Sequence, residues 1–177
     1  MSETEFSIGR HCGVTFAGLK PASLVSIDRR EGNVLAHLSD KFRAKGFYFV
    51  ILGGYDRLLV YVYHYERLQK LLLSREVKAF LYTLGYTYTS AEEAVGQLKE
   101  RMPGKFPHEI GVFLGYPLSD VRGFISDPNG CILCGCWKVY SNVAEAERTF
   151  ERYRRCSACI CRQMQQGKSL TQIFNVG

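Results

Sequence analysis

Phe47-Tyr-Phe-Val-Ile-Leu-Gly-Gly-Tyr-Asp-Arg-Leu-Leu-Val-Tyr-Val-Tyr63 is the stretch of sequence that decides the fold. Its two halves, 47–52 and 58–63, are rich in β-branched and aromatic residues and flank the turn-forming segment Gly53-Gly-Tyr-Asp56. This arrangement predicts a β-hairpin. The second half is apolar on both faces, which is typical of a central strand that is covered on both sides.

Most of the sequence outside this hairpin has helical periodicity, with apolar residues recurring every three to four positions. We therefore predict an α+β fold in which a small mixed or antiparallel sheet of about four strands, including the hairpin near 47–64, packs with several helices. The length of 177 residues suits a single domain over 1–177. The predicted flanking elements are helices at 5–20 and 33–45, a strand at 24–27, three helices between Leu68 and Met102, short helices at 107–114 and 118–125, a last strand at 132–140 and a long helix at 143–166.

The composition is that of an ordinary soluble globular chain, with 46% hydrophobic and 23% charged residues. No apolar run approaches the roughly 20 residues that a membrane span needs. The first six residues are acidic and lack the layout of a secretory signal. We therefore expect a cytoplasmic protein with no membrane partner, in which cysteines are reduced thiols, metal ligands or redox groups.

The net charge is +6, and much of the excess lies near the C-terminus. A basic helix there could bind nucleic acid or another polyanion. No nucleic-acid-binding motif accompanies the charge, so a solvated helix face is the favoured interpretation. Nucleic acid is disfavoured as a partner but left open. The residues concerned are Arg148, Arg152, Arg154, Arg155, Arg162 and Lys168.

Six of the seven cysteines form two C-x-x-C-x-C triplets, Cys131-Ile-Leu-Cys134-Gly-Cys136 and Cys156-Ser-Ala-Cys159-Ile-Cys161. Thiolates at this spacing bind soft metals or carry redox chemistry. On an unbroken helix the first two cysteines of the second triplet share one edge, whereas the third lies on the other side of the apolar stripe.

If 132–140 is a regular strand, Cys134 and Cys136 face the same way and Cys131 faces the opposite way. A metal site would then use a subset, such as Cys134 or Cys136 with Cys156. The alternative is that the thiols are small, buried, apolar filler. Neither the metal nor any cofactor follows from the sequence.

Two other groups of residues can carry chemistry. His108-Glu109 follows Pro107 at a predicted helix start, where a histidine beside a carboxylate could act in acid–base catalysis, although most such pairs are surface caps. Lys20 and Lys138 lie in apolar contexts, and a strand lysine beside the single tryptophan could bind an anion or form a cation–π contact. A solvent-facing strand lysine is the alternative.

The block from Phe106 to Phe124, FPHEIGVFLGYPLSDVRGF, together with CGCWKVY at 134–140, resembles a bacterial family of uncharacterised proteins, the domain of unknown function 3793 of anaerobic, clostridia-like bacteria. The opening residues His11-Cys12 and AGLKP at 17–21 also resemble that family, as does the C-terminal region. The family has no established activity. The resemblance implies a stand-alone cytoplasmic protein and points to Lys20, His108, Glu109, Tyr116, Asp120, Trp137 and Lys138 as the positions to examine.

This chain departs from the family at its cysteines. The family usually carries tyrosine at the position of Cys136, and Cys131, Cys159 and Cys161 are also less typical. The resemblance therefore favours Cys12, Cys134 and Cys156 as the more general set of metal ligands.

We expect a cleft that binds a small anionic ligand or catalyses a reaction, although whether the protein is an enzyme stays open. His108 and Glu109 are the catalytic candidates. The ligand-binding candidates are Lys20, Tyr116, Trp137 and Lys138. The alternatives are a metal- or redox-active protein that uses the C-terminal thiols, with Cys12, Cys134 and Cys156 as candidate ligands, and an interaction module that uses the basic C-terminal helix.

Overall fold

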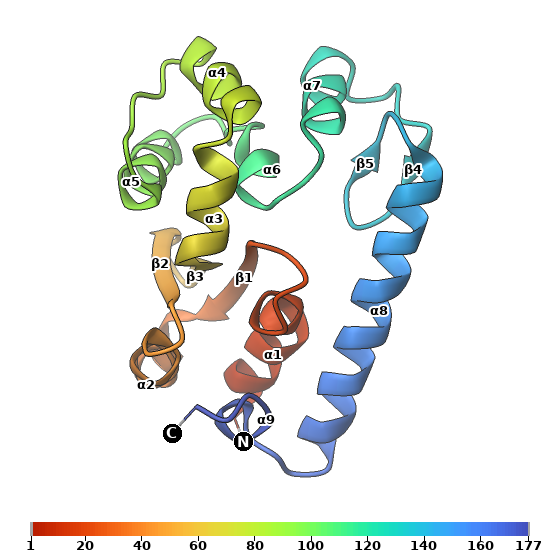
Figure 1. The fold of residues 1–177 in the computed structure, drawn as a ribbon. Helices are drawn as coiled ribbons and strands as arrows, with labels where there is room; N and C mark the ends of the chain where they lie inside the picture. The colour runs from red at the N-terminus through yellow and green to blue at the C-terminus, as the bar shows by residue number, and fades with distance from the viewer. Residues whose placement is uncertain (1, 177) are drawn as a thin grey trace.

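A computed structural model describes residues 2–176 and shows an α+β architecture (Figure 1). A three-stranded sheet lies at the centre, and a separate two-stranded ribbon lies beside the long helix α8. The strands are β1 (Ala22–Asp28), β2 (Phe47–Gly53), β3 (Arg57–His64), β4 (Leu133–Cys134) and β5 (Lys138–Val139). The helices are α1 (Glu3–Phe16), the 3-10 turn η1 (Arg29–Glu31), α2 (Gly32–Arg43), α3 (Tyr65–Leu72), α4 (Arg75–Thr83), α5 (Ala91–Arg101), α6 (Ile110–Phe113), α7 (Leu118–Ser126), α8 (Val143–Gln165) and α9 (Leu170–Ile173).

The predicted hairpin is confirmed as β2 and β3, and the sheet is antiparallel with the strand order β1-β3-β2. The central strand is β3, as the sequence indicated. Val60 pairs with Val25 of β1 and with Ile51 of β2. A register shift between Ile51 and Gly53 marks the point where β2 bends into the turn.

The two faces of β3 bury side chains in two different cores because successive strand residues point to opposite faces. Tyr61 and Tyr63 belong to the core formed with α3, α4, α5 and α6. Val60 and Val62 belong to the core formed with α1, α2 and the end of α8. The Tyr61 hydroxyl donates to the Phe113 carbonyl at 2.6 Å, and this hydrogen bond ties the end of α6 to the sheet.

The single strand predicted at 132–140 is wrong. The chain reverses between Cys134 and Lys138, and β4 and β5 pair with each other, so the central sheet has three strands rather than about four. The reversed segment lies close against α8. A side chain at Gly135 would place its Cβ 2.1 Å from Phe150 Cε2, so the chain can pass α8 closely there only as glycine.

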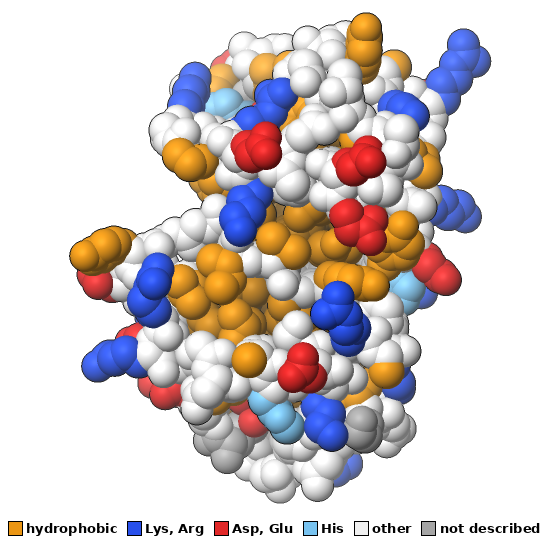
Figure 2. Space-filling view, turned by 90° about the vertical axis from the view of Figure 1, so that its left-hand side faces the viewer, with side chains coloured by type: hydrophobic (Ala, Val, Ile, Leu, Met, Phe, Trp, Pro, Cys, Tyr) orange, Lys and Arg blue, Asp and Glu red, His pale blue; other side chains and the backbone are white. Residues whose placement is uncertain are grey.

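The long helix α8 is continuous and runs from the ribbon to the opposite end of the molecule, where α9 follows it (Figure 1). Its Ile160 and Met164 are buried in the same core as α1. Figure 2 views the side on which α2, β2 and α5 lie. Hydrophobic side chains gather at its centre, over the edge strand β2. Within residues 2–176, no helix is both long and apolar enough to cross a bilayer.

Candidate functional site

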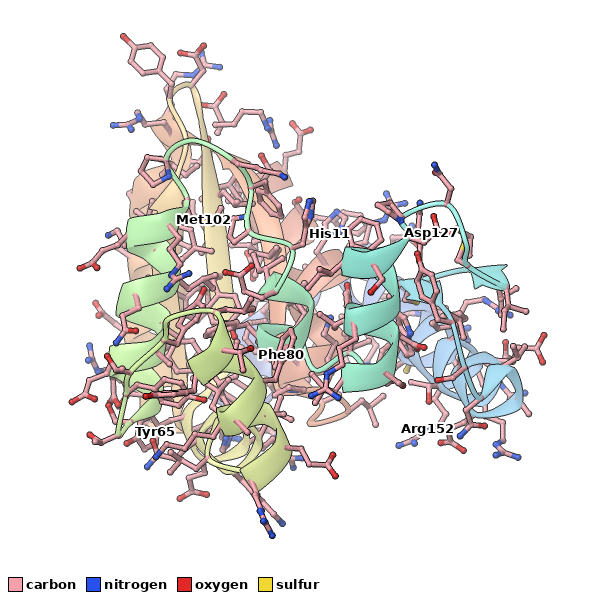
Figure 3. All side chains as sticks on the ribbon, turned by 90° about the horizontal axis from the view of Figure 1, so that it is seen from above. His11, Tyr65, Phe80, Met102, Asp127 and Arg152 are labelled. Carbon is pink, nitrogen blue, oxygen red and sulfur yellow. The ribbon has the colours of Figure 1, made fainter. Side chains whose placement is uncertain are left out.

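A cleft of about 350 Å³ lies between α6, α7 and the β4–β5 ribbon. This volume falls in the range of small-molecule sites. Figure 3 views this region from above and shows α7, which ends near the labelled Asp127, between α6 and the ribbon. The cleft is lined by Phe106, His108, Ile110, Gly111, Tyr116, Asp120, Val121, Phe124, Trp137 and Lys138.

Asp120 in the first turn of α7 fastens the ribbon to that helix. It is only 2% exposed, and its carboxylate accepts hydrogen bonds from Trp137 Nε1 at 2.7 Å, from the Tyr140 amide at 2.9 Å and from the Ser141 amide at 3.1 Å. Hydrogen bonds to an ionised acceptor are stronger than neutral ones. Asp120 therefore positions one wall of the cleft.

The Trp137 ring is fixed on three sides. Its N–H donates to Asp120, and its face stacks on the Tyr116 ring with the centroids 5.2 Å apart. The Phe150 ring meets it edge-on, with the two centroids 4.5 Å apart. These geometries are favourable for aromatic pairs. The aromatic wall is therefore preorganised.

Two basic side chains lie beside the Phe124 ring at the cleft. Lys138 Nζ is 5.4 Å from the ring centroid and donates a hydrogen bond to the Pro128 carbonyl at 2.5 Å. The exposed His108 ring meets Phe124 edge-on at 5.2 Å. Among residues 2–176, no carboxylate lies within salt-bridge distance of Lys138, so its positive charge is not neutralised by an ion pair.

Residues 8–174 match the sequence profile of a family described as "protein of unknown function (DUF3793)". The chain belongs to this family. The matched segment contains every residue that lines the cleft. No curated protein and no solved structure matches the chain, so the geometry of this DUF3793 protein carries the functional argument.

Four of the predicted site residues, His108, Tyr116, Trp137 and Lys138, lie together in the cleft. Glu109 does not line it. The Glu109 carboxylate accepts from the Tyr86 hydroxyl at 2.9 Å and lies 3.8 Å from Arg101 Nη1.

Burial, followed by the Glu109 charge, raises the pKa of Tyr86 well above its usual range. His108 and Glu109 are adjacent in the turn before α6, and their side chains have different partners: His108 lies against Phe124, whereas Glu109 accepts from Tyr86. The two side chains therefore do not meet in the cleft as the expected catalytic pair.

Lys20 also lies outside the residues that line the cleft, behind its aromatic wall. Its Nζ is 5.7 Å from the centroid of Tyr116 and 6.0 Å from that of Tyr153. Burial lowers the pKa of Lys20, and nearby Cys12 and Cys136 partly offset this effect. Lys20 thus contacts the ring that supports Trp137 rather than the cleft itself.

The three candidate metal ligands lie in different environments. Cys12 is fully buried in the core beneath the sheet, and burial raises its pKa to about 12. Cys156 is half-buried against the same core, whereas Cys134 is exposed on the ribbon. Within residues 2–176, no three His, Cys, Asp or Glu side chains are grouped closely enough to hold a metal ion, so these cysteines do not form a ligand set.

The expectation that Cys131 and Cys134 face opposite ways is wrong, because it assumed a regular strand. Cys131 precedes β4, and its Sγ lies 3.7 Å from the Sγ of Cys134. The second triplet lies on the unbroken α8, so no local break brings its three thiols together.

Three of the basic residues of α8 form ion pairs within the helix. Arg148 pairs with Glu145 at 2.7 Å, and Glu151 pairs with Arg155 at 2.6 Å and with Arg154. These pairs, three or four residues apart, are typical of a solvated helix face.

The sequence reasoning missed the apolar walls, Phe106 and Phe124, and the positioning residue Asp120 was noted only through the family resemblance. Aromatic residues at helical spacing normally indicate core. The signal available was local: Phe106 lies between two structure breakers, Gly104 and Pro107. In the structure Phe106 is 47% exposed.

Proposed function

We propose that this protein binds a small ligand that has a flat apolar body and one anionic group, such as an aromatic carboxylate. The observation that carries the proposal is a cleft of about 350 Å³ whose walls are aromatic rings and whose basic groups lie together at one ring, Phe124. Aromatic walls favour stacking of a flat group, and few convergent polar groups set its orientation.

The free donors of Lys138 support an anionic ligand. Lys138 uses one N–H to bind the Pro128 carbonyl, which leaves two further N–H donors on its ammonium group. The buried carboxylate in the cleft, Asp120, is occupied by donors from the ribbon. His108 is exposed at the same ring and can donate a second hydrogen bond.

Trp137 provides the test because it is the only tryptophan in the chain and forms a wall of the cleft. Two fluorescent probes of matched shape are compared: anilinonaphthalene sulfonate, which is anionic, and phenylnaphthylamine, which lacks the charge. Energy transfer from Trp137 to the bound probe restricts the signal to nearby sites. We expect the anionic probe to bind more tightly.

Lys138→Gln should weaken binding of the sulfonate about fivefold, corresponding to about 1 kcal/mol for one exposed charge pair, and leave the neutral probe unaffected. The matched control is Lys78→Gln, because Lys78 lies 5.9 Å from the Tyr88 ring centroid on another part of the surface. If both variants bind both probes as the unmodified protein does, the proposal is wrong. Phe124→Ala should weaken binding of both probes.

A further inference from the structure

We propose that Cys131 and Cys134 form a thiol–disulfide exchange site that reacts with small-molecule disulfides. The proposal does not depend on ligand binding in the cleft. It rests on the distance between two thiols, on their exposure and on the hydrogen bond between them.

The ribbon holds the two thiols together. The backbone is fixed by the Ile132 amide, which donates to the Val139 carbonyl at 2.8 Å, and by pairing of Cys134 with Lys138 across the ribbon. The two Sγ atoms are 3.7 Å apart, so they need to approach by roughly 1.7 Å to reach bonding distance. Because Cys134 is exposed and Cys131 is half-buried, side-chain rotation near the surface can provide this approach.

The two thiols have different roles. The hydrogen bond with Cys134 is the main cause that raises the pKa of Cys131, followed by burial, while Lys138 acts in the opposite direction. Exposure assigns the roles, because an external disulfide can reach the exposed Cys134 more readily than the half-buried Cys131. Cys134 is therefore the attacking thiol, and Cys131 is the thiol that resolves the intermediate.

The reaction balances with a small-molecule disulfide as the oxidant. The Cys134 thiolate attacks one sulfur of the disulfide, a mixed disulfide forms, and the first small thiolate leaves. The Cys131 thiolate then attacks the Cys134 sulfur, the intramolecular disulfide forms, and the second small thiolate leaves. Two electrons pass from the protein to the oxidant, and the two protons of the protein thiols go to the two small thiols.

The chain contains a built-in control with the same spacing, Cys156 and Cys159 on α8. Cys156 packs against the core, and the Cys159 sulfur accepts from Gln163 Nε2 at 3.7 Å rather than bonding its neighbour. The continuous helical backbone of α8 holds Cys156 and Cys159 in place. Cys12 is fully buried, so a dissolved disulfide does not reach it in the folded protein. The folded structure thus favours one C-x-x-C pair over the other.

The experiment equilibrates the reduced full-length protein in anaerobic mixtures of reduced and oxidised glutathione, then quenches with acid and alkylates. Intact mass and peptide mapping count the protected thiols. We expect two of the seven thiols to escape alkylation, and the peptide with Cys131 and Cys134 to lose two hydrogens. In concentrated urea, where spacing alone matters, both C-x-x-C pairs should oxidise to the same extent.

Two variants test the order of attack. Cys131→Ser should accumulate glutathione on Cys134, because the proposed resolving thiol is absent, and Cys134→Ser should accumulate much less adduct. Cys159→Ser should form the disulfide as the unmodified protein does. The proposal is overturned if all seven thiols stay alkylatable in the most oxidising mixture, if the disulfide involves other cysteines, or if the folded protein shows no preference between the two pairs.

Discussion

Asp120 offers the sharpest test of how the cleft is built. In Asp120→Asn the amide oxygen can still accept from the Tyr140 and Ser141 amides, which both bond Oδ1. The amide NH2 then faces Trp137 Nε1–H, so two donors meet where a charge-assisted hydrogen bond of 2.7 Å existed. The side chain is 2% exposed, so water cannot replace the lost acceptor.

A hydrogen bond to a charged group contributes about 1.5–3 kcal/mol, so Asp120→Asn should lower the free energy of unfolding by about 2 kcal/mol. Asp120→Ala removes the acceptor of four part-buried donors, which are the Trp137 indole, the Tyr140 and Ser141 amides and the Ser141 hydroxyl, and should cost about 4 kcal/mol. Urea unfolding monitored by Trp137 fluorescence and by circular dichroism measures both. The matched control is Asp127→Asn, because Asp127 is exposed and its acceptor role toward the Asn129 amide can be met by asparagine.

A double-mutant cycle with Trp137→Phe isolates the single bond. When the indole donor is absent, Asp120→Asn should lower the free energy of unfolding by about half as much as it does in the presence of Trp137, because two donors no longer face each other. Circular dichroism follows unfolding in this background. If the cost of Asp120→Asn is the same with tryptophan and with phenylalanine, or does not exceed that of Asp127→Asn, the reasoning about this bond is refuted.

Two further predictions concern a helix contact and a half-buried lysine. Gly123→Ala would place Cβ 2.3 Å from Tyr140 Cγ and should destabilise the fold by about 2 kcal/mol. Gly96→Ala, whose Cβ meets nothing within 4 Å, should stabilise α5 by about 0.5–1 kcal/mol. The two variants should shift the thermal unfolding midpoint in opposite directions, and equal shifts would contradict the packing. Because the folded pKa of Lys20 is lowered from 10.5, the unfolded chain binds more protons between the two pKa values, so stability rises with pH in that window. Lys20→Met should remove this rise and increase stability at neutral pH, while exposed Lys70→Met should do neither.

Much of the local structure could be predicted because it depends on residue periodicity over short distances. The hairpin of β2 and β3, the helix α7 and the long α8 follow directly from apolar spacing and turn residues. Four cleft residues were also identified, through unusual local context and family resemblance. Their grouping could not be derived from periodicity, because it depends on how α7 packs against the ribbon.

The failures have one common cause, which is contact between residues that are distant in the chain. The segment 132–140 has strand-like composition but reverses after Cys134, and Gly135 in the reversal lies close to Phe150 of α8. Cys131 lies before β4 rather than within a regular strand, so alternation does not separate it from Cys134. Glu109 was expected to act with His108, but the buried Tyr86, from the segment between α4 and α5, donates a hydrogen bond to its carboxylate.

The sequence by itself determined the hairpin and most of the helices, because backbone conformation responds to the nearest few side chains. It also determined the chemical inventory: one tryptophan, seven cysteines and a basic excess. Only the tertiary structure decided which of these groups meet. Close packing between α7, α8 and the ribbon selects a single set of neighbours from many that the sequence allows, and those neighbours define both the aromatic cleft and the adjacent dithiol.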